Sequence, residues 1–184
     1  MKVLGIAGSL RPDSYNKALL VAAAELFPAD VEFELWDGLK AVPPYDEVDD
    51  VIPAPAAVAR LRDAVAGADA VLFATPEYNS SIPGQLKNAI DWASRPLATN
   101  VLRNKPVAVV GASTGAFGAV WAQAELRKVL GATGARVVDG EVAVGHAQQR
   151  FVDGRLVDAN LSEQLQEVVA ALVAEIRPRA AIAA

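Results

Sequence analysis

The sequence predicts an α/β protein with one parallel sheet that is covered by helices on both faces. Short apolar runs alternate with amphipathic segments along the chain, as expected of right-handed strand–helix–strand crossovers. One run, 70–74, is apolar at every position, which is typical of a strand buried on both faces. The chain has 184 residues, enough for one domain with a substantial core, and we expect a single domain over 1–184.

The individual elements follow from the spacing of apolar residues. Strands are expected at 2–7, 31–36, 69–74, 105–111 and 135–141, and helices near 14–27, 55–67, 84–94, 117–131 and 160–177. Pro76 ends the third strand because proline has no N–H for the ladder. The last helix should begin at a cap, Asn160, and stop by Arg177, because Pro178 disfavours helical geometry in the residue before it; the remainder is expected to be a frayed tail.

The connection from residue 41 to residue 55 carries four prolines and four acidic residues. This composition is typical of a rigid and exposed connection, and we expect 41–55 to link the second strand to the second helix in that form.

The loop after the first strand, Gly8–Asn16, carries groups that suit a phosphate. It offers hydroxyls at Ser9 and Ser14, the guanidinium of Arg11, the amide of Asn16 and the free N–H groups of a helix start. The helix dipole favours an anion, and an arginine can bind two oxygens at once. Each of these residues alone is also typical of an ordinary capped helix.

The loop after the third strand, Pro76–Ile82, is polar and holds one aromatic residue, Tyr78. Open α/β sheets bind ligands at the carboxyl ends of their strands, where the strand order reverses. Five strands alternating with helices fit the order 2-1-3-4-5, which is a common order of doubly wound sheets, and in that order the reversal lies between the first and third strands. The loops after the first and third strands therefore flank the point of the sheet at which a ligand is expected to bind.

Taken together, the two segments resemble the NADPH-dependent FMN reductase family, which includes quinone and chromate reductases and has a flavodoxin-like fold. The first loop matches in Gly8-Ser-Leu-Arg11, Ser14 and Asn16. The second segment is the more specific, and it matches in Pro76-Glu-Tyr-Asn79, Ser81, Pro83-Gly84 and Leu86-Lys-Asn-Ala-Ile-Asp-Trp92. Weaker similarity continues to about residue 155.

The resemblance implies an FMN site built from three loops. The phosphate would lie on the first loop and the isoalloxazine along the second, while Gly111–Gly115 would border the other edge of the ring. The implied cofactor-binding residues are Ser9, Arg11, Ser14, Tyr15, Asn16, Pro76, Glu77, Tyr78, Asn79 and Ser113. No catalytic side chain is expected, because the flavin carries the hydride chemistry.

Composition excludes several classes of protein. Although 53% of the residues are apolar, no run approaches the ~18 apolar positions of a membrane span. The absence of cysteine excludes disulfides, thiolate metal sites and iron–sulfur clusters. A net charge of −5 without a basic cluster argues against nucleic-acid binding.

The single histidine, His146, does not make a metal site. The chain enters a core strand directly at Met1–Ile6, so no signal peptide is expected, and we place it in the cytoplasm.

Two rival motifs are weaker. Gly5–Gly8 with Asp37 partly matches a dinucleotide fingerprint, but the full glycine pattern is missing and the acid comes too late. Gly111–Gly115 is a literal G-x-S-x-G, with Asp139 and His146 following in the order of a serine hydrolase built on Ser113. That interpretation would leave the two longer motifs without a role.

A flavodoxin-type electron carrier is the third alternative. The phosphate loop here contains Arg11, and Tyr78 is the only aromatic residue in the loop assigned to the ring, whereas flavodoxins use an arginine-free loop and two aromatics. An open flavin face favours stacking of a nicotinamide. Trp36, Trp92 and Trp121 are expected in the core or at an interface.

We therefore expect an FMN-dependent NAD(P)H oxidoreductase. NADPH or NADH would reduce the flavin and leave before a small-molecule acceptor binds; free flavin, quinones, chromate, azo dyes and nitroaromatics all remain open. Trp92 and Ile82 fall outside the apolar stripe of helix 84–94, which indicates a partner surface. The resembling family also forms dimers or tetramers, so a homodimer or homotetramer is expected.

Overall fold

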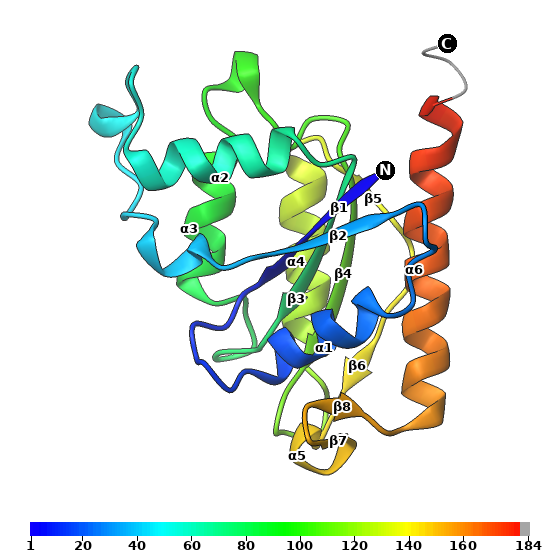
Figure 1. The fold of residues 1–184 in the computed structure, drawn as a ribbon. Helices are drawn as coiled ribbons and strands as arrows, with labels where there is room; N and C mark the ends of the chain where they lie inside the picture. The colour runs from blue at the N-terminus through cyan, green and yellow to red at the C-terminus, as the bar shows by residue number, and fades with distance from the viewer. Residues whose placement is uncertain (181–184) are drawn as a thin grey trace.

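A computed structural model describes residues 1–180 and shows a parallel sheet between two layers of helices (Figure 1). The sheet has the order β2-β1-β3-β4-β5, with β6 also paired to β4, and this order confirms the flavodoxin-like fold expected from the sequence. Its strands are β1 (Lys2–Ala7), β2 (Glu32–Trp36), β3 (Ala70–Thr75), β4 (Pro106–Ala112), β5 (Arg136–Val137) and β6 (Ala143–Val144).

The helices divide between the two faces of the sheet. One face is covered by α2 (Ala56–Ala66), α3 (Gly84–Ala93) and α4 (Val120–Ala132), and the other by α1 (Tyr15–Ala24) and α6 (Ala159–Ala180). Alternate strand residues enter the two cores: in β3, Val71 and Phe73 face the first group of helices, whereas Ala70, Leu72 and Ala74 face the second. Every residue of β3 is buried, and this burial accounts for the continuous apolar run that predicted the strand.

The fifth strand differs from the expected 135–141, because it is split into β5 and β6. Gly140, with φ of +131°, lies in the break. Arg127 of α4 fills it: its guanidinium donates to the Val109 carbonyl at 3.1 Å and also to the Gly140 carbonyl. Burial lowers the pKa of Arg127 below its ordinary value, and the nearby Glu141 carboxylate opposes that effect. The polar run 139–141 therefore interrupts the ladder, and an arginine takes the place of the missing strand bonds.

The last helix also differs from the prediction. Its cap is Asp158 and not Asn160, because the Asp158 carboxylate accepts the Leu161 N–H at 3.0 Å. The helix continues through Pro178 to Ala180. Proline removes one backbone donor, and this loss is tolerated in a final turn more readily than in a helix interior. The remainder of the expected tail, 181–184, lies outside the described residues. Within residues 1–180, no helix combines the length and apolarity needed to cross a bilayer.

The connection between β2 and α2 contains two short 3₁₀ turns, η1 (Gly38–Ala41) and η2 (Glu47–Asp49). Polar side chains of α3 bind the backbone of this connection. Trp92 donates its indole N–H to the Pro43 carbonyl at 2.9 Å and packs edge-on against Tyr45, while Asn88 accepts the Tyr45 N–H at 2.7 Å. Trp92 is fully buried and Ile82 is 7% exposed. The interpretation of these two residues as a partner surface is therefore wrong, since the connection of their own chain covers the indole.

A short hairpin that was not predicted from the sequence lies between α5 (Ala147–Arg150) and α6, and it is formed by β7 (Phe151–Val152) and β8 (Arg155–Leu156). The two residues of its turn, Asp153 and Gly154, have φ of +50° and +77°. Asp-Gly is the preferred pair for a two-residue hairpin turn of this kind, so the sequence did carry a signal for it. A third 3₁₀ turn, η3 (Leu97–Thr99), lies between α3 and β4 and completes the described elements.

Candidate functional site

Three loops meet at the carboxyl edge of the sheet. Loop 1 (8–14) follows β1, loop 2 (76–83) follows β3 and loop 3 (113–119) follows β4. The strands end at the same level, because Ala7 pairs with Ala74 and Thr75 pairs with Gly111. Loop 1 is also bonded directly to β3, since the Gly8 N–H donates to the Ala74 carbonyl at 2.8 Å. Residues far apart in sequence are thus brought into one region.

Loop 1 leads into a capped helix whose first amides are free to bind an anion. Ser14 is the N-cap of α1, and its hydroxyl accepts the Lys17 N–H at 3.4 Å. Helix geometry leaves the N–H groups of Tyr15 and Asn16 without intrahelical acceptors. The Arg11 side chain is exposed, and its guanidinium donates only to the Asp13 carbonyl among the described residues. Ser9 accepts the Arg11 N–H. These groups fit a phosphate dianion.

The side-chain amide of Asn16 binds the backbone of β4 and is therefore not available to a phosphate. It is 3% exposed, and its amide makes two hydrogen bonds of 2.9 Å to the backbone of Ala112, donating to the carbonyl and accepting from the N–H. This pair joins the start of α1 to the end of β4, just before loop 3. The group of Asn16 that remains available to a phosphate is its backbone N–H.

Loop 2 is a tight turn that presents Tyr78. The N–H and carbonyl groups of Tyr78 and Ser81 bond to each other, and the residues between them, Asn79 and Ser80, have φ of +52° and +60°. This is the geometry of a type I′ turn, in which asparagine is favoured at the first position. Tyr78 is 52% exposed. An aromatic ring is therefore held at the rim of the loop by rigid backbone.

Glu77 connects loop 2 to α4. Its carboxylate accepts the N–H groups of Trp121 and Ala122, each at 3.1 Å. Ala119 at the N-cap has φ of +61° and no side chain that can cap the helix, so Glu77 supplies the missing acceptor. The loops assigned to opposite edges of a flavin are thereby fixed to each other.

Loop 3 does not have the arrangement of a serine hydrolase. Ser113 Oγ accepts the Gly115 N–H at 3.1 Å. Within residues 1–180, no hydrogen bond joins Ser113 Oγ to His146 or His146 to Asp139, and His146 is exposed. The described residues also contain no group of three potential metal-ligating side chains.

Some residues near the site gave no clear signal in the sequence. Phe117 and Trp121 are 64% and 48% exposed and pack edge-on with ring centroids 4.9 Å apart, beside the contact made by Glu77. Lys17, Asp37 and Lys40 line a hollow beside loop 1. In the sequence, Asp37 matches only part of a dinucleotide fingerprint. The two lysines are ordinary surface residues until the fold brings them together.

Comparison with known proteins gives consistent matches. Residues 1–149 match the family model described as NADPH-dependent FMN reductase. The chain is 45% identical to an NAD(P)H-dependent FMN reductase of Pseudomonas aeruginosa, over 96% of each chain. It is 37% identical to a 2-hydroxy-1,4-benzoquinone reductase of a Burkholderia species, over 97% of this chain and 98% of that one. The solved structure of the flavoenzyme NAD(P)H:(acceptor) oxidoreductase FerB of Paracoccus denitrificans has a TM-score of 0.86 and 38% identity, over 96% of this chain and 97% of that chain.

The double contact between Asn16 and Ala112 can be tested by stability. Replacing Asn16 by Ala leaves a buried N–H and a buried carbonyl unpaired, and we expect a loss of about 2–4 kcal/mol in the free energy of unfolding. Urea denaturation with an unchanged m-value measures it. The matched control is Asn160→Ala on the exposed start of α6, which should cost less than about 0.5 kcal/mol.

A second variant, Asn16→Asp, separates the two hydrogen bonds. It keeps an oxygen that accepts the Ala112 N–H and removes the N–H group that donates to the Ala112 carbonyl. An ionised carboxylate beside the Ala112 carbonyl is destabilising, so the folded state should raise the pKa of this side chain. Stability relative to Asn16→Ala should then be greatest in acid and be lost as pH rises through that pKa. A cost within 0.5 kcal/mol for both variants would contradict a structural role for Asn16.

Proposed function

Because this chain belongs to the NADPH-dependent FMN reductase family, we propose that it oxidises NADPH or NADH at an FMN held across loops 1, 2 and 3 and passes the electrons to a quinone. It is an oxidoreductase with FMN as its cofactor. The quinone is proposed because relatives of similar length carry the names quinone reductase and 2-hydroxy-1,4-benzoquinone reductase. FMN supplies the hydride-accepting chemistry when it is bound.

The observation that carries this proposal is the connection of the three loops by Asn16 and Glu77. Loop 1 would bind the phosphate through the hydroxyls of Ser9 and Ser14, the guanidinium of Arg11 and the amides of Tyr15 and Asn16. Loop 2, from Pro76 to Asn79, would lie along the ring and present its backbone to the polar edge, while Ser113 of loop 3 would lie on the other side. The contacts already present hold these groups before any ligand arrives, which reduces the cost of binding.

The side chains of loop 2 favour a reductase over a closed electron carrier. Tyr78 is the only aromatic side chain in loop 2, and its exposure leaves space beside it for a second planar molecule. A nicotinamide and then a quinone could occupy that space in turn. No acid or base is required of the protein if the acceptor takes protons from water. Since the reductant is a metabolite of the cell interior, we place this activity in the cytoplasm.

The exposed pair of Phe117 and Trp121 supports an interface with a second copy of the chain. Two large aromatic side chains in contact and open to solvent are unusual on a monomer, and such patches commonly mark partner sites. They lie at the start of α4, whose amides bind Glu77. A homodimer formed here would place the subunit boundary beside the flavin.

The phosphate assignment predicts a preference for FMN over riboflavin. Arg11→Ala should weaken FMN by about 10- to 150-fold, as expected for a lost charge-assisted hydrogen bond, and should leave riboflavin affinity nearly unchanged. Titration of the apoprotein by flavin fluorescence measures both affinities. Arg60→Ala, at an exposed arginine of α2, is the control. Equal affinities of the unmodified protein for FMN and riboflavin would contradict the assignment.

The reductase function predicts that NADPH or NADH bleaches the bound flavin in anaerobic stopped-flow experiments. Steady-state rates with a quinone should give parallel double-reciprocal lines, because the oxidised nicotinamide leaves before the acceptor binds. Ser113→Ala should retain FMN and most of the activity. If the flavin stays oxidised with both dinucleotides, the function is that of an electron carrier. Labelling of Ser113 by a fluorophosphonate would instead support a hydrolase.

Oligomeric state forms a separate prediction. Light scattering at micromolar concentration should give at least twice the chain mass of 19.2 kDa. Phe117→Glu with Trp121→Glu should reduce it to the monomer, since the burial of two carboxylates opposes association. Val48→Glu, at a residue 81% exposed in η2, is the control and should not change the mass. A monomer mass for the unmodified protein would overturn this proposal.

A further inference from the structure

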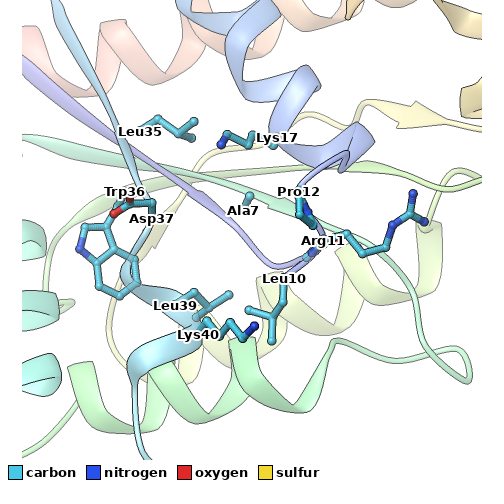
Figure 2. A pocket seen from close by; sticks show the side chains of 11 residues that line it. Ala7, Leu10, Arg11, Pro12, Lys17, Leu35, Trp36, Asp37, Leu39 and Lys40 are labelled. Carbon is cyan, nitrogen blue, oxygen red and sulfur yellow. Dashed lines mark hydrogen bonds between the residues drawn. The ribbon is translucent and has the colours of Figure 1, made fainter.

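A second feature of the carboxyl edge is a hollow of about 200 Å³ between loop 1 and the end of β2 (Figure 2). Its apolar lining includes Ala7, Leu35 and Leu39, and the indole of Trp36 forms one end. The backbone of η1 comes close to the indole, because a Cβ on Gly38 would lie 2.5 Å from the Trp36 ring. The hollow thus belongs to the β1–β2 side of the sheet, whereas loops 2 and 3 belong to the β3–β4 side.

Two lysines and one aspartate supply the charge of this hollow. Lys17 reaches it from α1 and Lys40 from η1, on opposite sides in Figure 2, and Asp37 lies at the end of β2. Among residues 1–180, neither lysine ammonium makes an ion pair or a hydrogen bond, and the Asp37 carboxylate caps no helix. The Arg11 side chain extends away from the hollow, so its guanidinium remains available to a phosphate on loop 1.

The hollow on the other side of α1 is less suited to an anion. It is larger, at about 710 Å³, but its three basic residues are balanced by three acidic ones: Arg11, Lys17 and Arg155 against Asp13, Glu25 and Asp153. A balanced set of charges gives little preference for an anion. The hollow beside Trp36 has an excess of positive charge over an apolar floor, which is the combination that favours a phosphorylated ligand.

We propose that the hollow beside Trp36 binds the adenosine ribose of the nicotinamide dinucleotide and sets the preference between NADPH and NADH. Lys17 and Lys40 would contact the 2′-phosphate of NADPH, whereas Asp37 would accept the 2′-hydroxyl of NADH. An acid at the end of a second strand binds that hydroxyl in other dinucleotide sites, and a nearby cation accommodates the 2′-phosphate. This inference rests on the proposed function, since it concerns the reductant of the same reaction.

The positions of the strands allow one dinucleotide to reach from the hollow beside Trp36 to loop 2. Strand β2 is separated from β3 by β1 alone, so the hollow is about two strand spacings, or ~10 Å, from loop 2. An extended dinucleotide spans that distance between its nicotinamide and its adenosine ribose. The FMN phosphate on loop 1 would lie between the two, with Arg11 directed to it and the lysines directed to the other ligand.

The test uses the FMN-loaded protein, so that loop 1 is already filled. Calorimetric titration compares 2′,5′-ADP with 5′-AMP, which lacks the 2′-phosphate, and with inorganic phosphate. We expect 2′,5′-ADP to bind at least ten times more tightly than either. Lys40→Ala and Lys17→Ala should each weaken 2′,5′-ADP by about 5- to 10-fold, because both lysines are exposed and solvent screening weakens a charge pair at such a site. Lys40→Arg should retain the affinity, and Lys128→Ala, on α4 outside the hollow, is the control.

Kinetics supply the second readout. The ratio of kcat/KM for NADPH to kcat/KM for NADH should fall by about 5- to 10-fold in Lys40→Ala and rise in Asp37→Asn. Equal affinity for 2′,5′-ADP and 5′-AMP, an unchanged ratio in both variants, or phosphate binding as tightly as 2′,5′-ADP would each overturn the inference. Those outcomes are compatible with normal flavin reduction. Loss of reduction by both dinucleotides in the unmodified protein would instead contradict the proposed function.

Discussion

The paired hydrogen bonds between Asn16 and Ala112 are the constraint on which the rest of the site depends. They join residues that are 96 positions apart and hold the start of α1 against the end of β4. Because β3 lies between β1 and β4, this contact also fixes the boundaries of loop 2. The carboxylate of Glu77 adds a second fixed point at the start of α4. A polar site built on loops thus has the rigidity that binding normally requires of helices and strands.

Close packing beneath the loops explains why glycine is needed at two positions of the loop motifs. A Cβ on Gly8 would approach the Leu86 side chain to 2.8 Å, and one on Gly111 would approach the amide nitrogen of Gln123 to 2.9 Å. Gln123 is fully buried and donates to the Gly118 carbonyl within loop 3. The first glycine of the G-x-S-x-G sequence is therefore required by the packing of α4 on β4, which is a structural reason for a pattern that elsewhere marks a nucleophile.

Local patterns were sufficient to predict most strands and helices, because apolar runs and helix caps are encoded by neighbouring residues. The strand order followed instead from the flavodoxin-like fold that the resemblance implies. Errors arose where distant polar partners decide the outcome. Trp92 lies off the apolar stripe of α3, yet the Pro43 carbonyl accepts its indole N–H and buries it. Arg127 closes the break in the fifth strand from a helix that precedes it. In the candidate site, the position of the three loops could be predicted from the sequence, whereas the partners of Asn16 and Glu77 could not, since nothing in the sequence indicates which distant backbone group a side chain will bind.

The distribution of charge is compatible with the proposed binding of phosphates by a chain with net charge −5. Coulomb interactions are screened beyond about 8–10 Å at physiological salt, so the local arrangement matters more than the total. Loop 1 separates two positive regions: the amides of α1 with Arg11 on one side, and Lys17 with Lys40 across the hollow on the other. Neither lysine is neutralised by an acidic partner within the described residues. The acidic residues of the 46–50 connection lie in a separate exposed segment, where Asp50 pairs with Arg62. The protein can therefore be acidic overall and still carry local positive regions at the carboxyl edge of its sheet, as the proposed phosphate sites require.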